Sequence, residues 1–184
     1  MQLDNSLADL EIPHQETFRR STRVISSIDN LDRLADRWNS LNTGLNSPIQ
    51  DFSWSQVCAR SICANDKLRI VVSSLGEKVV AIAPLFQSKG MLSPLKMPGV
   101  GKLDEPMDFL YADLPALDAL AQALKKIGQA INLERIPSNS PVIAALRQVY
   151  QGSGKAIEQT GSKSYLSIEA PALGWSRGWH RHPF

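Results

Sequence analysis

Hydrophobic residues are most concentrated in residues 68–86, where two runs rich in valine and isoleucine flank a polar turn. In the first run the apolar residues alternate from Leu68 to Val72, the period of a strand with one well-buried face. The second run, residues 79–83, is apolar at every position, which predicts a strand covered on both sides. Gly76 supplies the backbone freedom of a tight turn between them, so the segment is predicted to be a β-hairpin.

Pro84 directly follows the second run and has no N–H to donate to a neighbouring strand. We therefore expect a splay or bulge in residues 83–85. A strand that is buried on both faces needs helices above and below it. The predicted fold class is α/β (α+β), a mixed and largely antiparallel central sheet with helices on both faces, forming a single lobe.

Four amphipathic helices are predicted around the hairpin. Apolar residues recur at helical spacing in residues 31–41, after a cap at Asp29 or Asn30. A second helix opens at Phe52, where Ser53 and Gln56 fit a capping box. The third is capped by Asp113 and ends at Gly128, and the fourth starts at Ser140-Pro141. Further strands are predicted at residues 24–27, 87–101, 108–111, 132–136, 155–159 and 165–168.

The chain has 184 residues, enough for one domain or one lobe of a larger protein. Residues 1–23 show no sustained period and are predicted to be a mobile arm. Residues 24–169 form the predicted lobe, and residues 170–184 an atypical tail. The net charge of +2 and the absence of a basic cluster argue against nucleic-acid binding. No segment is apolar enough to span a membrane or to act as a secretory signal, so we expect a cytoplasmic protein.

Cys58 and Cys63 are five residues apart on a predicted helix and are not expected to face each other. Two free, mostly buried thiols in a reducing compartment are favoured over a disulfide or a metal site. The three histidines, His14, His180 and His182, lie near the termini. No carboxylate stands at ligand spacing from them, so we expect no metal site. A Ser-His-Asp triad is not available either, which excludes most hydrolase mechanisms.

Acidic residues just before a predicted strand are the strongest candidates for chemistry. Asp104 and Asp108 follow a glycine-containing turn, and carboxylates at a strand end can orient an amine or act as a general base. Phe52 and Trp54 are candidates to line the adjacent substrate cleft. The alternatives stay open: the carboxylates can cap turns and face solvent, and the aromatic residues can serve the core. No catalytic residue is identified beyond these cleft candidates.

Several patterns together resemble one family. They are Val24 to Leu41 with Trp38-Asn39, Phe52-Ser53, the hairpin ending in Ala83-Pro84-Leu85, Ile136-Pro137 with Ser140-Pro141, and Ser164 to Ile168. Over about residues 22–169 the chain resembles the amino-terminal half of the CelD-type acyltransferases of cellulose biosynthesis. These are relatives of the FemAB peptidyltransferases within the GNAT superfamily of acetyltransferases.

The resemblance implies a GNAT-like fold and an acyl transfer from acetyl-CoA or another acyl-CoA to an amine or hydroxyl acceptor, in polysaccharide or cell-envelope biosynthesis. In these relatives the CoA-binding loop belongs mainly to a second lobe. This chain ends at Phe184, and neither Gly101-Lys102 nor Gly154-Lys155 has the spacing of a nucleotide P-loop. We therefore expect that this chain binds no cofactor and is incomplete for catalysis.

Residues 170–184 depart from the family pattern, with two tryptophans among arginines and histidines. They are interpreted as a truncated or frame-shifted reading, or as a genuine tail that binds a partner. Loss of a second lobe would leave an exposed sheet edge that favours self-association. The alternative to an acyltransferase lobe is a non-catalytic module that binds another protein. A metal-dependent hydrolase is the third and least favoured interpretation.

Overall fold

A computed structural model describes residues 19–41, 48–90, 92–99 and 106–152. All of them belong to one unit that ends at Gly154. The predicted arm residues 1–18, Asp104, the strands at 155–159 and 165–168, and the tail 170–184 lie outside the described residues.

The described elements begin with one strand and a series of helices, continue with a series of strands, and end with two helices that flank a short strand. Their bounds in chain order are β1 (Arg20–Ile25), α1 (Ile28–Asp32), α2 (Ala35–Leu41), the 3₁₀ helix η1 (Pro48–Gln50), α3 (Phe52–Val57), the π-helical turn η2 (Cys58–Ile62), β2 (Lys67–Leu68), β3 (Ile70–Leu75), β4 (Lys78–Ala83), β5 (Phe86–Gln87), β6 (Leu95–Lys96), β7 (Leu110–Tyr111), α4 (Leu114–Ile127), β8 (Ile131–Asn132) and α5 (Pro141–Tyr150).

The hairpin 68–86 is confirmed, and it stands in the middle of a sheet with the order β1-β3-β4-β7. All pairs in this sheet are antiparallel. A second sheet, β2-β5-β6-β8, continues the hairpin arms beyond the break that was predicted at residues 83–85. At this break the Leu85 carbonyl accepts the Arg69 N–H at 2.9 Å, and the Leu85 N–H turns back to Ala83 at 3.0 Å.

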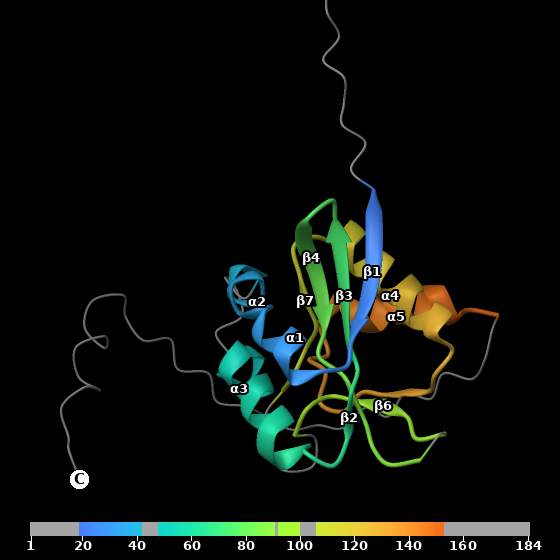
Figure 1. Ribbon diagram of the computed structural model, residues 1–184. Helices are drawn as coiled ribbons and strands as arrows, with labels where there is room; N and C mark the ends of the chain where they lie inside the picture. Colours follow the sequence, from blue (N-terminus) through green and yellow to red (C-terminus); the bar gives the residue numbers. More distant parts are fainter. Residues whose placement is uncertain (1–18, 42–47, 91, 100–105, 153–184) are drawn as a thin grey trace, which may run out of the picture. The chain divides into compact units, whose positions relative to one another are not determined.

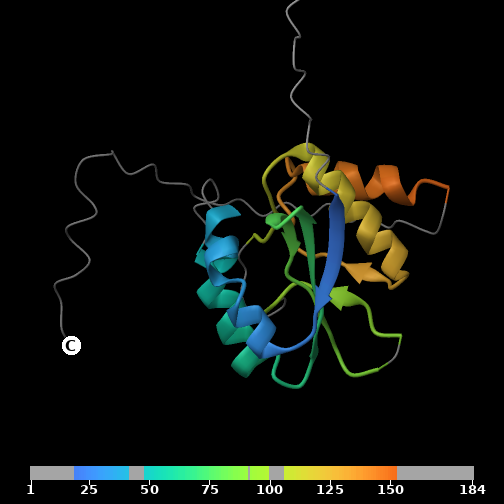
Figure 2. The same cartoon turned by 45° about the horizontal axis from the view of Figure 1, so that its top comes forward.

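Helices cover both faces of the β1-β3-β4-β7 sheet, as the apolar pattern predicted (Figures 1 and 2). Helices α1 to α3 pack on one face, where Trp38, Phe52 and Ile82 belong to the same buried cluster. Helices α4 and α5 pack on the other face, with Leu120 and Phe109 in their cluster. The predicted fold class, a mixed and largely antiparallel α/β lobe, is therefore confirmed.

A β-bulge interrupts the alternation of side chains along β4. The register between β3 and β4 slips at Ser73 and Ser74, which pair with Ala81 and Val79. Val80 is the extra residue, and its carbonyl accepts the N–H of Ala112 at 2.9 Å. As a result Val80 and Ala81, which are consecutive, both contribute to the cluster under α4, while Val79 and Ile82 contribute to the opposite one.

Three local predictions were wrong. Strand β1 starts at Arg20 rather than at residue 24, because the polar residues 20–23 pair with β3 through their backbones at an outer position of the sheet. Strand β3 is buried on both faces rather than one, because α4 also packs against it. The Ser53 capping box does not form: Asp51 caps α3 and accepts the Ser53 N–H at 2.8 Å.

The caps of α4 and α5 follow the sequence, whereas the first helix and the strand predicted at 132–136 differ from it. Ser27, rather than Asp29 or Asn30, caps the first helix, which breaks into α1 and α2. Asp113 caps α4 and accepts the Ala116 N–H at 2.7 Å, and Gly128 ends that helix in a left-handed conformation. Ser140 caps α5 in front of Pro141, as predicted. The predicted strand at 132–136 is reduced to β8, which pairs in parallel with β6.

The central position of β4 generates the first prediction. Replacing Ile82, which is fully buried, by alanine is expected to lower the free energy of unfolding by about 2–5 kcal/mol, because it removes apolar contact and leaves a cavity. Val24→Ala on β1, where the side chain is 41% exposed, is the matched control and is expected to change it by less than about 0.5 kcal/mol. Urea denaturation measures both, and equal losses would contradict the assignment of β4 to the core.

Candidate functional site

Asp108 lies where the central sheet opens. Strand β7 pairs with β4 through Tyr111 with Ala81 and Leu110 with Ile82. Continuing that register by two residues sets Asp108 opposite Pro84, which cannot donate a ladder hydrogen bond. Beyond this point the β4 chain leaves for the second sheet, and the Met107 N–H bonds the Arg135 carbonyl at 3.2 Å instead. The predicted carboxylate therefore sits at the splay.

The Asp108 side chain is 8% exposed and well supported. Its Oδ1 accepts the backbone N–H of Phe109 at 2.8 Å, and the carboxyl also hydrogen-bonds the side chain of Ser140, the cap of α5. Burial raises the pKa of Asp108 above its ordinary value, although the bonds from Ser140 and Phe109 oppose that shift. The pKa of Tyr111 is also raised, first by burial and then by the charge of Asp108. The arrangement provides a partly desolvated carboxylate with capacity to accept further hydrogen bonds.

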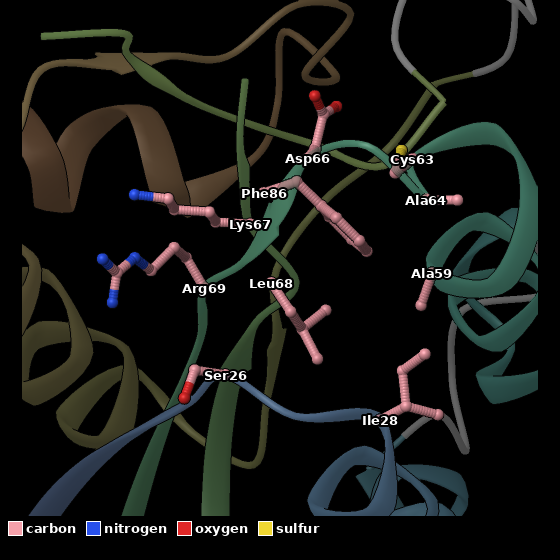
Figure 3. Close-up of a pocket in the computed structure, with 10 residues that line it drawn as sticks. All are labelled: Ser26, Ile28, Ala59, Cys63, Ala64, Asp66, Lys67, Leu68, Arg69 and Phe86. Atoms are coloured by element: carbon pink, nitrogen blue, oxygen red, sulfur yellow. The ribbon is translucent and has the colours of Figure 1, made fainter. Parts of the chain in front are cut away.

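A cavity of about 370 Å³ opens beside the second sheet (Figure 3). Apolar side chains from α1, η2, β2 and β5 line it, among them Ile28, Leu68 and Phe86. Lys67 and Arg69, on either side of Leu68 in the chain, also line the cavity, and Figure 3 shows their side chains extending away from that of Leu68. Sequence reasoning missed this cavity, because the strands that form it are only two residues long and carry no periodic signal.

A π-helical turn brings Cys58 and Cys63 together, so the prediction that they do not face each other was wrong. The Cys63 N–H donates to the Cys58 carbonyl at 2.7 Å, which is the five-residue spacing of a π turn. Both thiols are free and buried, as predicted. The Cys58 thiol hydrogen-bonds the Cys63 sulfur and lowers the pKa of Cys63 to about 7, against the effect of burial. The backbone of Gly99 also hydrogen-bonds this sulfur, whereas the pKa of Cys58 is raised.

The two aromatic candidates, Phe52 and Trp54, have different surroundings. Phe52 is 7% exposed and packs edge-on against Trp38, with ring centroids 5.9 Å apart, so it is a core residue. Trp54 is partly buried between the two clusters and lies against Gly99. Its Nε1–H is buried and finds no partner among the described residues. The described partners of Asp108 are Phe109, just before β7, and Ser140, the cap of α5, and neither Phe52 nor Trp54 is among them.

The starts of the two longest described helices, α4 and α5, do not fit the pyrophosphate of an acyl-CoA. An anion at a helix N-terminus needs free N–H groups and no competing negative charge. At α4 the Asp113 carboxylate already takes the Ala116 N–H, and Pro115 has none to offer. At α5 the Ser140 hydroxyl takes the Val142 N–H at 3.1 Å, and Pro141 again lacks a donor.

Within the described ranges, no group of three or more His, Cys, Asp or Glu residues is placed to hold a metal ion. The helices described here are also too short or too polar to cross a membrane.

Comparison with known proteins gives a structural likeness at low sequence identity. No family model matches the chain, and no curated protein matches it. Among solved structures, the chain is similar to a protein from Clostridium difficile 630 described as a possible acetyltransferase. The two are 13% identical with a TM-score of 0.45, over 82% of this chain and 99% of that one. A likeness at this level assigns no function to this chain.

The raised pKa of Asp108 predicts how stability depends on pH. Its contribution is full below the unfolded-state pKa of ~3.9 and is lost as pH rises through the higher folded-state pKa. Asp108→Asn is therefore expected to flatten the decline in unfolding free energy as pH rises above about 4. Asp118→Asn, at an exposed position on α4, is the control. If unfolding free energies from urea denaturation depend on pH in the same way for the wild type and for Asp108→Asn, the raised pKa of Asp108 is contradicted.

The contact between Gly99 and Trp54 predicts a steric effect that a matched glycine isolates. Gly99 and Gly128 both have positive φ, at 72° and 71°. A Cβ at Gly99 would lie 2.6 Å from Cζ2 of Trp54, whereas a Cβ at Gly128 meets nothing within 4 Å. Gly128→Ala is expected to cost roughly 1–2 kcal/mol for the backbone alone. Gly99→Ala is expected to lower the free energy of unfolding by more than Gly128→Ala does and to shift the tryptophan fluorescence. Equal losses in the two variants would contradict the predicted clash with Trp54.

Proposed function

We propose that this chain forms the acceptor-binding lobe of an acyltransferase, in which Asp108 holds and deprotonates the amine or hydroxyl that receives the acyl group. The observation that carries the proposal is the position of Asp108, a buried carboxylate two residues before β7, just past the last paired residues of β4 and β7. A carboxylate that burial makes more basic is a better general base near neutral pH than an exposed one.

Each contact of Asp108 has a part in this proposal. The Phe109 N–H fixes Oδ1 at 2.8 Å, and Ser140 restrains the carboxyl from the start of α5. These two hydrogen bonds leave lone pairs that can accept an amine or hydroxyl proton. The side chain then carries the proton as a neutral acid, a state that its buried position favours. An acyl-CoA supplies the activated thioester when it is bound. The starts of α4 and α5 do not provide a site for its pyrophosphate.

The finer assignment rests on the resemblance of residues 22–169 to the CelD-type acyltransferases. On that basis we propose that the acceptor is a sugar hydroxyl or amine of a cell-envelope polysaccharide. The mixed antiparallel fold with helices on both faces supports this lineage, since it is the class of fold that the resemblance implied. The polysaccharide itself stays a proposal.

The alternative, a protein-binding module, is favoured by one observation. Val57 and Ile62, at the ends of the π-turn region, are 49% and 41% exposed. Large apolar side chains on the surface of a helix are a common feature of contacts with other proteins.

An amine titration followed by nuclear magnetic resonance tests the proposal. Ethanolamine, which offers both an amine and a hydroxyl, is expected to shift the amide signal of Phe109 and its neighbours in a saturable manner. Asp108→Asn should weaken this binding about tenfold or more, because it removes a charge-assisted hydrogen bond. Asp118→Asn should leave the binding unchanged, since that carboxylate is exposed on α4.

Shifts that persist unchanged in Asp108→Asn, or that are scattered over the surface, would contradict the proposal. A calorimetric titration with acetyl-CoA adds a second measurement on the whole chain. Binding at micromolar strength would support an enzyme. Flat heats, together with no response to the amine, would favour the protein-binding module.

A further inference from the structure

The π-helical turn places two thiols where an ordinary helix would separate them. In an α-helix, residues five apart point about 140° away from each other. The i to i+5 hydrogen bond from Cys63 to the Cys58 carbonyl at 2.7 Å, within the widened turn η2, removes that separation. The thiol of Cys58 consequently hydrogen-bonds the sulfur of Cys63. Neither thiol has a role in the function proposed above.

We propose that Cys58 and Cys63 form a redox-active dithiol that hydrogen peroxide converts reversibly into a disulfide across this turn. The π turn sets the two thiols so that they interact with each other, and a disulfide requires the sulfur atoms to approach to about 2.05 Å with a suitable torsion angle. The proposal is independent of the acyltransferase assignment.

The two cysteines have different parts in the reaction. Cys58 is fully buried, whereas Cys63 is 7% exposed and lines the cavity of about 370 Å³. Figure 3 shows Cys63 at one end of that cavity, which is wide enough to admit an oxidant little larger than water. The hydrogen bonds from Cys58 and from the Gly99 backbone favour the thiolate of Cys63, which is the form that reacts.

The steps balance as a two-electron oxidation. The Cys63 thiolate sulfur attacks one oxygen of peroxide, the O–O bond breaks, and hydroxide leaves, so that Cys63 becomes a sulfenic acid. The sulfur of Cys58 then attacks the Cys63 sulfur, the S–O bond breaks, and water leaves with the proton of Cys58. The two thiols lose two electrons, and peroxide is reduced to two molecules of water. A reducing dithiol such as dithiothreitol reverses the change.

The sequence between the two cysteines makes the product easy to detect. Arg60 lies between them, so trypsin separates residues 38–60, with Cys58, from residues 61–67, with Cys63. After exposure of the native full-length chain to peroxide and digestion without reductant, mass spectrometry is expected to find these two peptides joined. Dithiothreitol should release them. In Cys58→Ser, Cys63 should stop at the sulfenic acid and be trapped by dimedone, with the fold checked by circular dichroism.

Three outcomes would overturn the proposal. The first is that both peptides stay unjoined and unmodified in the native chain, and become joined only after unfolding in urea. The second is that Cys63 is driven to sulfinic acid in the wild type without a joined peptide. The third is that the cross-link forms only between two copies of the chain, which intact mass under non-reducing conditions distinguishes.

Discussion

The missing N–H of Pro84 is the constraint on which the rest of this structure depends. Up to Ala83, strand β4 is buried on both faces and pairs with β3 and β7. At Pro84 the ladder cannot continue, and the hairpin arms pass into a second sheet through β2 and β5. The opening that results has two consequences. It brings the buried Asp108 to the end of a strand without a ladder partner, and it leaves the short second sheet to form one wall of the cavity.

Local hydrogen bonds hold the residues around this opening in place on both faces of the sheet. On the side of α5, Ser140 supports Asp108 while it also caps its own helix. On the side of α3, the Asp51 cap and the pairing of Asp32 with Gln56 and Arg60 hold the helix that continues into the π turn. Gly99 lies so close to Trp54 of α3 that a Cβ at this position would be 2.6 Å from Cζ2 of the ring, a clash that only a residue without a side chain avoids.

Much of the fold was predictable from the sequence because the relevant signals are local. The valine and isoleucine runs, Pro84, and the caps Asp113 and Ser140 act within a few residues of their positions in the chain. The burial of β3 was predicted wrongly. Arg69 and Ser73 alternate with apolar residues, which indicates one exposed face, but α4 covers the face on which Val71 lies. Whether a strand has a second covered face is a tertiary property, and alternation alone does not report it.

The site was predictable only in part for the same reason. Asp108 was found because a carboxylate before a strand is visible in the sequence, but its position just past the last pair of β4 and β7 follows from the tertiary pairing of these strands. Asp104 lies outside the described residues, and Phe52 belongs to the core. The contact between Cys58 and Cys63 was not predicted because an α-helix has 3.6 residues per turn, so that residues five apart point in different directions. No local sequence pattern indicates the π turn that brings them together.

The central claim is that the sheet opens at Pro84, and cross-strand nuclear Overhauser effects in the full-length chain test it most directly. The account predicts contacts between Ile82 and Leu110 and between Ala81 and Tyr111, with none continuing from Pro84 to Asp108 along the same ladder. A regular ladder of contacts that runs past Pro84 to Asp108 and Met107 would contradict it.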